Sequence, residues 1–120
     1  MTPERFNRFC ATLPGAQHVV QWGGSDVWKV GPKVFAIGVR QQSRMLVTFK
    51  VSPMAYALLR EQPGLRPAPY LASRGLSWIQ EYAAPGLPDT DLRAYLTESH
   101  RLVVAGLSRR QRRLLDLAEG

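Results

Sequence analysis

The sequence predicts an α+β domain in which helices from both ends of the chain cover one face of an antiparallel β-sheet meander. Residues 27–51 contain three short runs of alternating apolar and polar residues, which are typical of half-buried strands. An amphipathic helix pattern precedes these runs, and a longer one follows near the end of the chain. Because 120 residues is an ordinary size for one domain, we expect residues 1–120 to form a single domain.

The N-terminal segment predicts a helix followed by a short strand. Thr2 and Pro3 are typical of an N-cap and a first helical position. Apolar residues then recur at helical spacing as far as residues 13–15, where Leu-Pro-Gly ends the helix. Cys10 lies on this apolar stripe, so we expect it to be buried rather than reactive. Residues 18–22 fit a first strand.

The register of the central strands follows from their turns. Residues 31–32, Gly-Pro, suit a two-residue hairpin turn, and Gln42 is the expected tip of the second hairpin. Pairing about that tip gathers the bulky side chains on one face, because side chains alternate with a period of two. The predicted partners are Phe35 with Phe49, Ile37 with Val47 and Val39 with Met45.

This register places four cations on the opposite face: Lys29, Arg40, Arg44 and Lys50. Arg40 and Arg44 would face each other beside the tip, where like charges repel unless an anion lies between them. Two interpretations stay open, an ordinary solvated sheet face or a surface that contacts phosphates. Because no aromatic residue is interleaved with these cations, the pattern favours contacts to a phosphate backbone over stacking on unpaired bases.

The segments after the meander predict a second helix and one more strand. Ser52 and Pro53 begin a short helix. The proline-rich residues 63–69 predict turns and extended chain rather than a helix. Residues 77–82 fit a last strand, with Trp78 as an anchor in the core.

Two helices are predicted at the C-terminal end. Asp89 is the expected N-cap of a long helix ending near Leu107, and Ser99 on its apolar stripe is small enough for close approach to the sheet. Ser108 then begins a final helix whose first turns hold four arginines: Arg109, Arg110, Arg112 and Arg113. The N-terminus of a helix carries partial positive charge, so each cation there lowers the stability of the helix by on the order of 0.3–1 kcal/mol. A bound phosphate would relieve this repulsion. Two alternatives stay open: Asp116 partly compensates the charge of these arginines, or the long helix and the final helix form one continuous helix.

Composition limits the classes of function. The formal charge is +7, from 16 Lys and Arg against 9 Asp and Glu, which favours polyanionic partners. One cysteine excludes an intrachain disulfide. No apolar run is long enough to span a membrane, and the first residues lack a secretory signal, so we expect a cytoplasmic protein without membrane contact.

Catalytic and cofactor motifs are absent from the sequence. It contains no P-loop, dinucleotide-binding or nucleophile-elbow motif, no Cys-x-x-Cys and no His-Glu-x-x-His. Two histidines far apart make a metal cage improbable. We therefore expect no cofactor, no metal and no enzymatic activity.

Several short motifs, in this order, resemble the MmcQ/YjbR family over nearly the whole chain. The best matches are Gly31–Ala36, the Pro53 helix after a strand bearing Lys50, and Ser99–Val103. The resemblance implies a frataxin-like (CyaY-like) fold and a DNA-binding role in which β hairpins act as wings. Two residues depart from the family pattern. Arg74 would replace a lysine of the pattern, at a different distance from the tryptophan that follows, and His100 occupies a position where tyrosine is usual. The acidic helix surface with which frataxins bind iron is missing, so iron is not expected.

The resulting prediction is a monomeric or weakly dimeric DNA-binding protein that contacts mainly phosphates, with little sequence readout. Its sheet surface would be flanked by Arg74 and by the arginines of residues 109–113. One alternative is a protein-interaction or regulatory module whose basic face meets an acidic partner. Another is a small-ligand domain or an unrecognised enzyme, which would need a deep pocket beside Trp22 and Trp78.

Overall fold

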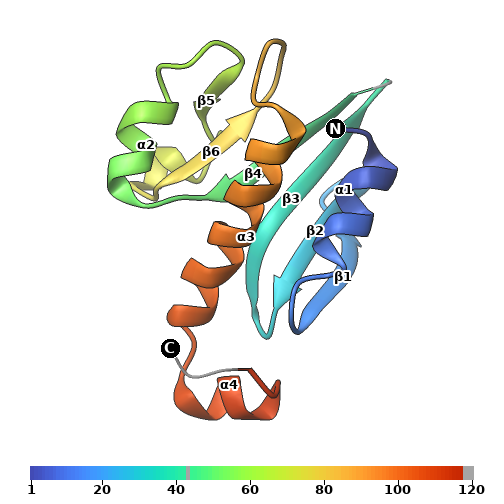
Figure 1. Cartoon of the computed structure of the whole chain (residues 1–120), viewed down its shortest axis with the longest axis vertical. Coiled ribbons are helices and arrows are strands. Elements are labelled where there is room, and N and C mark those ends of the chain that lie inside the picture. Colours follow the sequence, from blue (N-terminus) through green and yellow to red (C-terminus); the bar gives the residue numbers. More distant parts are fainter. Residues whose placement is uncertain (43, 118–120) are drawn as a thin grey trace.

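The computed structural model describes residues 1–42 and 44–117, without the side chain of Ser73. Within these residues the helices are α1 (Pro3–Cys10), α2 (Pro53–Leu59), α3 (Asp89–Ala105) and α4 (Arg109–Leu114), with a short 3₁₀ helix at Ala72–Arg74. The strands are β1 (Ala16–Gln21), β2 (Ser25–Val30), β3 (Lys33–Gln41), β4 (Arg44–Lys50), β5 (Leu65–Pro67) and β6 (Trp78–Glu81). They form one antiparallel sheet in the order β1-β2-β3-β4-β6-β5, which confirms the predicted α+β fold (Figure 1).

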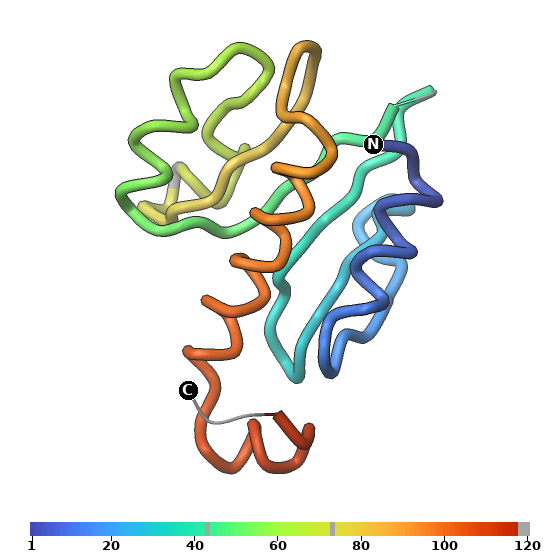
Figure 2. The backbone as a smooth tube through the Cα atoms, viewed as in Figure 1, coloured from blue at the N-terminus to red at the C-terminus, as the bar shows by residue number. Residues whose placement is uncertain are grey.

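Helices from both ends of the chain lie on the same side of the sheet, as predicted. Helix α3 packs across β3 and β4, and α1 packs on β3 (Figure 1). Helix α2 packs against β5 and β6, and α4 lies beyond the lower end of α3. The β1–β2 hairpin therefore forms one edge of the sheet and the segment around β5 forms the other (Figure 2).

The side of the sheet under α1 and α3, here called the covered face, carries the hydrophobic core. Its central row, set by the strand register, is Trp28, Ala36, Phe49 and Ile79. Helix α1 adds Phe6 and Cys10 to this core, and α3 adds apolar residues such as Leu96, all fully buried. Burial raises the pKa of the Cys10 thiol to about 12, so the group stays protonated and unreactive, as the sequence predicts.

The register of β3 differs from the prediction against both neighbouring strands, and against β2 the difference is a β-bulge. Trp28 pairs with Ala36 but Lys29 pairs with Val34, which leaves Phe35 as the extra residue. From Ala36 onward, each side chain of β3 therefore lies on the sheet face opposite to the predicted one. The observed partners are Ile37 with Thr48, Val39 with Leu46 and Arg40 with Met45. The hairpin to β4 is shifted as well, since Gln41 pairs with Arg44. The predicted pairings of residues 35, 37 and 39 with residues 49, 47 and 45 are wrong by one position for this second reason.

Ser99 of α3 takes the place of a strand in the ladder at this bulge. Its Oγ donates a hydrogen bond to the carbonyl oxygen of Phe35 at 2.6 Å and accepts one from the backbone nitrogen of Lys50 at 2.9 Å. Both backbone groups would otherwise lose their partners where the ladder is interrupted. The small residue predicted for close helix–sheet approach therefore has a specific hydrogen-bonding role.

Gly38 also lies on the covered face rather than on the opposite one. A Cβ at this position would lie 2.6 Å from Sδ of Met45 and 2.7 Å from Cε2 of Phe6. Both distances are shorter than van der Waals contact. The glycine therefore lets α1 approach β3 through the ring of Phe6.

The helix ends follow local sequence signals with one exception. Thr2, Ser52 and Ser108 are N-caps whose side-chain oxygens accept backbone hydrogen bonds, as predicted. Asp89 is instead the first residue of α3, and Pro88 precedes it without a side-chain cap. The carboxylate of Asp89 lies 3.6 Å from the N-terminal amine and 3.5 Å from Nη1 of Arg5, which ties the start of α3 to α1.

Candidate nucleic-acid interface

The β3 bulge separates Arg40 from the three other cations that were predicted to share its face. Lys29, Arg44 and Lys50 lie on the side of the sheet away from α1 and α3. This side is here called the open face and is defined by the row Val27, Ile37, Thr48 and Gln80. Arg40 pairs with Met45 and therefore belongs to the covered face. The predicted arrangement of Arg40 opposite Arg44 is wrong, since Gln41 is the partner of Arg44.

Both hairpin arginines are held by carboxylates. Nε of Arg40 donates to Oδ2 of Asp26 at 3.1 Å, and Nη2 of Arg44 lies 3.6 Å from Oε1 of Glu81. These two acids are almost completely buried, with 3% exposure each. Arg40 and Arg44 therefore neutralise buried negative charge, and less of their charge is available to a phosphate.

Asp26 is the centre of a polar cluster at the edge of the covered face. Oδ1 accepts a hydrogen bond from Nε2 of His18 at 2.8 Å, in addition to the Arg40 contact. Burial alone would raise the pKa of the Asp26 carboxyl, but the hydrogen bonds from His18, Arg40 and Asn7 outweigh it and hold the pKa below its usual value. The His18 ring also packs on Trp28, with 5.0 Å between ring centroids. His18 is thus a structural partner of β2.

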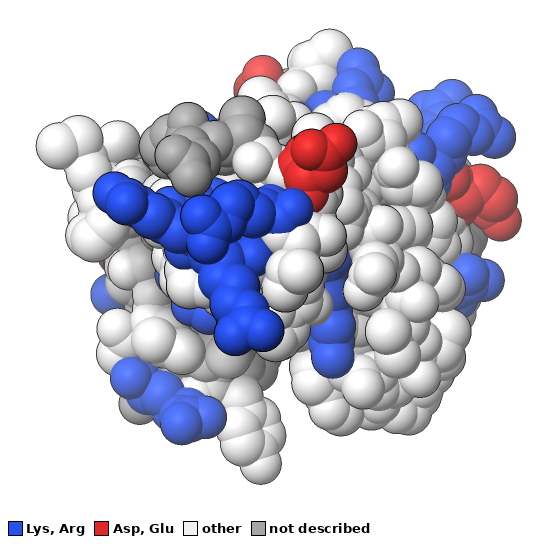
Figure 3. All heavy atoms as spheres, turned by 90° about the horizontal axis from the view of Figure 1, so that it is seen from below, with Lys and Arg blue, Asp and Glu red and all other residues white. Residues whose placement is uncertain are grey.

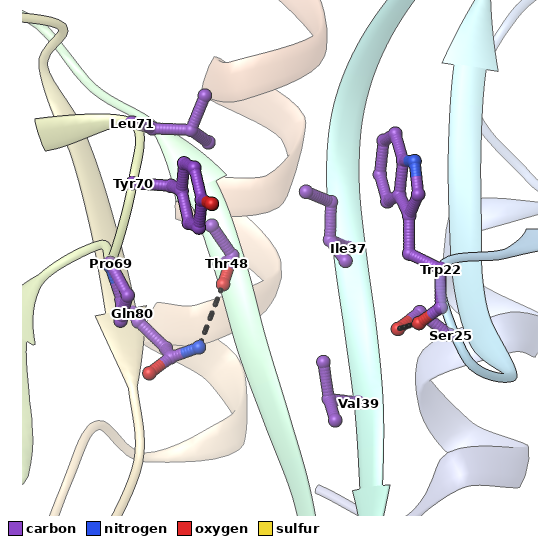
Figure 4. Close-up of a pocket in the computed structure, with 9 residues that line it drawn as sticks. All are labelled: Trp22, Ser25, Ile37, Val39, Thr48, Pro69, Tyr70, Leu71 and Gln80. Carbon is purple, nitrogen blue, oxygen red and sulfur yellow. Dashed lines mark hydrogen bonds between the residues drawn. The ribbon is translucent and has the colours of Figure 1, made fainter. Parts of the chain in front are cut away.

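A groove of about 540 Å³ lies on the open face (Figure 4). Ile37, Val39 and Thr48 form its floor, as Figure 4 shows. Trp22, from the β1–β2 turn, stands on one side, and Tyr70, from the segment between β5 and β6, stands on the other. Its volume is in the range of small-molecule pockets. The pocket required by the small-ligand alternative therefore exists beside Trp22, although Trp78 does not line it.

Two exposed aromatic residues flank the groove on unusual backbone. Trp22 is 62% exposed and Tyr70 is 85% exposed. Their φ angles are +51° and +74°, in the left-handed region that bulky residues rarely adopt. Gly23 and Gly24 continue this left-handed turn after Trp22, where a side chain would be strained. The sequence placed Trp22 beside the pocket of the small-ligand alternative, but it gave no indication of Tyr70, which follows a proline-rich segment.

A chain of polar side chains crosses the open face beside the groove. Nε and Nη2 of Arg66 donate to Oε1 of Gln80 at 2.9 and 2.7 Å, and Nε2 of Gln80 donates to Oγ1 of Thr48 at 3.3 Å. Arg66 also lies over the ring of Tyr82, with 4.5 Å between its Cζ and the ring centroid. Arg66 is thus a further cation of the open face. The sequence did not reveal it, because β5 is a short strand in the segment predicted as turns and extended chain.

Helix α4 carries the densest group of arginines. Arg109, Arg110 and Arg113 are exposed, and the structure places none of them within ion-pair distance of a described carboxylate. Seen from below, Lys and Arg side chains gather over this end of the molecule (Figure 3). Arg74 is also exposed, in the 3₁₀ helix between β5 and β6.

Arg112 differs from its neighbours because it stabilises the preceding helix. Its Nη1 donates to the carbonyl oxygens of Val104 and Leu107 at 3.3 and 2.9 Å, at the C-terminal end of α3. A cation is favourable there, since the last carbonyls of a helix carry partial negative charge. The predicted repulsion at the start of α4 is therefore partly offset by α3, and the two helices are separate. Arg112 is less available to an external anion than Arg109, Arg110 and Arg113.

The part of the chain that the structure describes offers no cluster of three His, Cys, Asp or Glu side chains able to hold a metal ion. Across residues 1–42 and 44–117, no helix has the length and apolar character needed to cross a bilayer. His100 is buried, and its Nε2 lies 2.7 Å from the carbonyl oxygen of Pro14. It therefore serves the packing of α3 against the end of α1.

Fold and site together define a small basic α+β protein with a groove on the open face and an arginine-rich C-terminal helix. A family model described as YjbR matches residues 11–102, and the chain belongs to this family, as its motifs predict. Protein YjbR of Escherichia coli K12 is 30% identical over 118 residues, covering 96% of this chain and 98% of that protein. Protein YbdF of Escherichia coli O157:H7 is 28% identical over 113 residues, covering 92% and 90%.

Two solved structures share the fold. Deinococcus radiodurans protein DR2400 superposes with a TM-score of 0.83 at 22% identity, covering 98% of this chain and 89% of that one. A Pseudomonas syringae protein superposes with a TM-score of 0.67 at 17% identity, covering 85% and 98%. At these identities the likeness establishes the fold alone. The two Escherichia coli relatives are described as uncharacterized, so the comparisons assign a family and a fold but no activity.

Proposed function

We propose that this protein is a DNA-binding protein rather than an enzyme, and that it holds DNA mainly through phosphates. The observation that supports this best is the uncompensated charge of α4. Arg109, Arg110 and Arg113 are exposed on a helix that buries none of its residues, so packing does not explain them. Arginine forms bidentate hydrogen bonds with phosphate oxygens, and a net charge of +7 attracts a polyanion over longer distances.

The open face extends this surface. Lys29 and Lys50 lie there, and Arg66 and Arg74 belong to the segments at the β5 edge. Arg40 and Arg44, the predicted centre of the interface, take a smaller part because Asp26 and Glu81 hold them. In this proposal the protein acts in the cytoplasm as a monomer or weak dimer, with low sequence specificity.

The proposal is tested by fluorescence anisotropy with a labelled duplex and its separated strands at several salt concentrations. Each phosphate contact contributes about −0.9 to the slope of log K against log salt for a duplex. Replacing Arg109, Arg110 and Arg113 by glutamine should therefore reduce the slope by up to about 2.7 and weaken binding.

The matched control removes the same charge elsewhere: Arg8→Gln, Arg60→Gln and Arg101→Gln. These residues are also exposed, but they lie on α1, after α2 and on α3. The control should change the slope by much less than the α4 variant. If both triple variants lost the same amount of salt slope, binding would depend on net charge alone, and this result would contradict an interface at α4. An isotherm independent of salt would contradict DNA binding through phosphates altogether.

A further inference from the structure

The groove on the open face is not explained by phosphate contacts. Six of its nine lining residues are apolar or aromatic, and none carries a charge: Trp22, Ser25, Ile37, Val39, Thr48, Pro69, Tyr70, Leu71 and Gln80. An apolar floor between two exposed aromatic side chains suits a flat ring with two faces to bury. The left-handed backbone at both Trp22 and Tyr70 is a conformation that usually persists only where surrounding structure or function requires it.

The polar atoms of the groove define the edge of such a ring. Oε1 of Gln80 accepts from Arg66, and one N–H of Nε2 donates to Thr48. Among the described residues the second N–H of Nε2 has no acceptor, so it can donate to a ligand. Because Oγ1 of Thr48 already accepts from Gln80, its own hydrogen is available to donate. Oγ of Ser25 donates to the carbonyl of Trp22 at 3.2 Å and keeps lone pairs that can accept. The groove thus offers two donors and one acceptor, which matches a neutral heterocycle carrying both acceptors and a donor.

The cations around the groove indicate what such a ring is attached to. Lys50 follows Thr48 by two residues on the open face, and Lys29 likewise follows Val27, the partner of Ile37. Two residues along a strand span about 7 Å, roughly the spacing of a base from a neighbouring phosphate. Arg66 lies at the other edge, on Gln80. A neutral floor with cations beyond it complements a neutral ring on an anionic chain.

We propose that the groove binds an unpaired base of single-stranded DNA, with the base between Trp22 and Tyr70 and its edge on Thr48, Gln80 and Ser25. This inference rests on the proposed DNA binding and refines it. Bases are enclosed in a duplex, so only an unpaired strand can insert one. The protein should therefore bind single strands more tightly than duplex of the same length, with α4 and the open-face lysines on the phosphates.

The test compares three labelled DNAs of equal length: a thymine strand, the same strand with abasic sites, and a duplex. The abasic strand keeps every phosphate but offers no ring, so it should bind about tenfold more weakly than the thymine strand. Trp22→Ala should weaken binding of the thymine strand by a similar factor and leave the duplex and abasic strand unchanged. Trp22→Phe, which keeps an aromatic face, should recover most of the loss.

Val20→Ala is the matched control, because Val20 lies on the same hairpin, is 60% exposed and does not line the groove. Intrinsic fluorescence gives a second measurement, since Trp28 and Trp78 are buried with 6% and 8% exposure. Quenching on addition of the thymine strand should thus come from Trp22 and should disappear in Trp22→Phe.

Three sets of outcomes separate the proposals. Salt-dependent DNA binding that is equal for thymine and abasic strands, or unaffected by Trp22→Ala, overturns the groove site while DNA binding stands. Absence of binding to all three DNAs overturns both. Free thymidine bound as tightly as the thymine strand would make the groove a small-molecule site and overturn the assignment to DNA.

Discussion

The two faces of the sheet use the same strands for opposite purposes. On the covered face, the central residues Ala36, Phe49 and Ile79 are fully buried beneath two helices. On the open face, Ile37 is only partly buried, and the buried Thr48 and Gln80 are polar and hydrogen-bonded to each other. The covered face therefore provides the stability of the fold, and the open face has side chains whose hydrogen-bonding capacity is incompletely used.

The bulge at Phe35 determines which residues belong to which face. Before it, Lys29 and Val34 pair on the open face, and after it Arg40 lies on the covered face. A single additional residue thus brings Ile37 and Val39 into the groove and takes Arg40 to the buried carboxylate of Asp26. This difference implies that substitutions on the covered face should act on folding, and that those on the open face should act on binding.

The largest effect should come from truncating an aromatic side chain of the covered face. Phe49 is fully buried and its ring stacks on Tyr95 with 5.7 Å between centroids. Phe49→Ala should lower the free energy of unfolding by about 3–5 kcal/mol, because it leaves a cavity between sheet and α3. Ile37→Ala, on the half-buried open face, should cost less than about 2 kcal/mol. Denaturant unfolding of the two variants measures both values, and equal losses would contradict the division between the faces.

Ser99→Ala should have the next largest effect. The substitution leaves the backbone N–H of Lys50 and the carbonyl of Phe35 without their partner, at a cost of about 1–3 kcal/mol in the free energy of unfolding. Hydrogen exchange at the amide of Lys50 should become faster. Thr97→Ala is the control on the same helix, since its hydroxyl is exposed and bonds to the Arg93 carbonyl one turn earlier. If both variants were equally stable, the role of Ser99 at the bulge would be refuted.

Local signals were enough to predict most of the elements. The N-caps at Thr2, Ser52 and Ser108 and the turn at residues 31–32 follow from side-chain and backbone preferences within a few residues. The position of the bulge does not follow in this way. Ser99, which completes the ladder there, lies 64 residues from Phe35, and the apolar residues on both sides of Phe35 fit either register.

The candidate site was predicted correctly only where the bulge has no influence. Lys29 precedes the bulge and Lys50 lies on the neighbouring strand, so both are on the predicted face. Arg40 lies beyond the bulge and was assigned to the wrong face. The groove needs Trp22 and Tyr70 from opposite edges of the sheet, and no spacing along the chain indicates that they approach the same floor.

A smaller effect is expected from the pH dependence of Asp26, which tests the edge of the covered face. Because its pKa is lower in the folded protein than its ordinary value of 3.8, the unfolded chain takes up the proton first as pH falls. The stabilisation is therefore complete above about pH 5 and is lost as pH falls through the folded-state pKa. Asp26→Asn should unfold with a flatter pH dependence below pH 5, by thermal or denaturant unfolding. Asp91→Asn, an exposed acid in the first turn of α3, is the control and should keep the wild-type profile.

The smallest effect on stability, and the sharpest separation of the faces, should come from the open-face lysines. Lys29→Gln with Lys50→Gln should change the free energy of unfolding by no more than about 0.5 kcal/mol, because neither side chain forms an ion pair with a described carboxylate. The same variant should reduce the salt slope for single-stranded DNA by about 1.4, from about 0.7 for each phosphate contact. Arg40→Gln should show the reverse, with a larger loss of stability through Asp26 and a smaller change of slope. If Arg40 controlled the slope and the lysines controlled stability, the assignment of folding to one face and binding to the other would have to be exchanged.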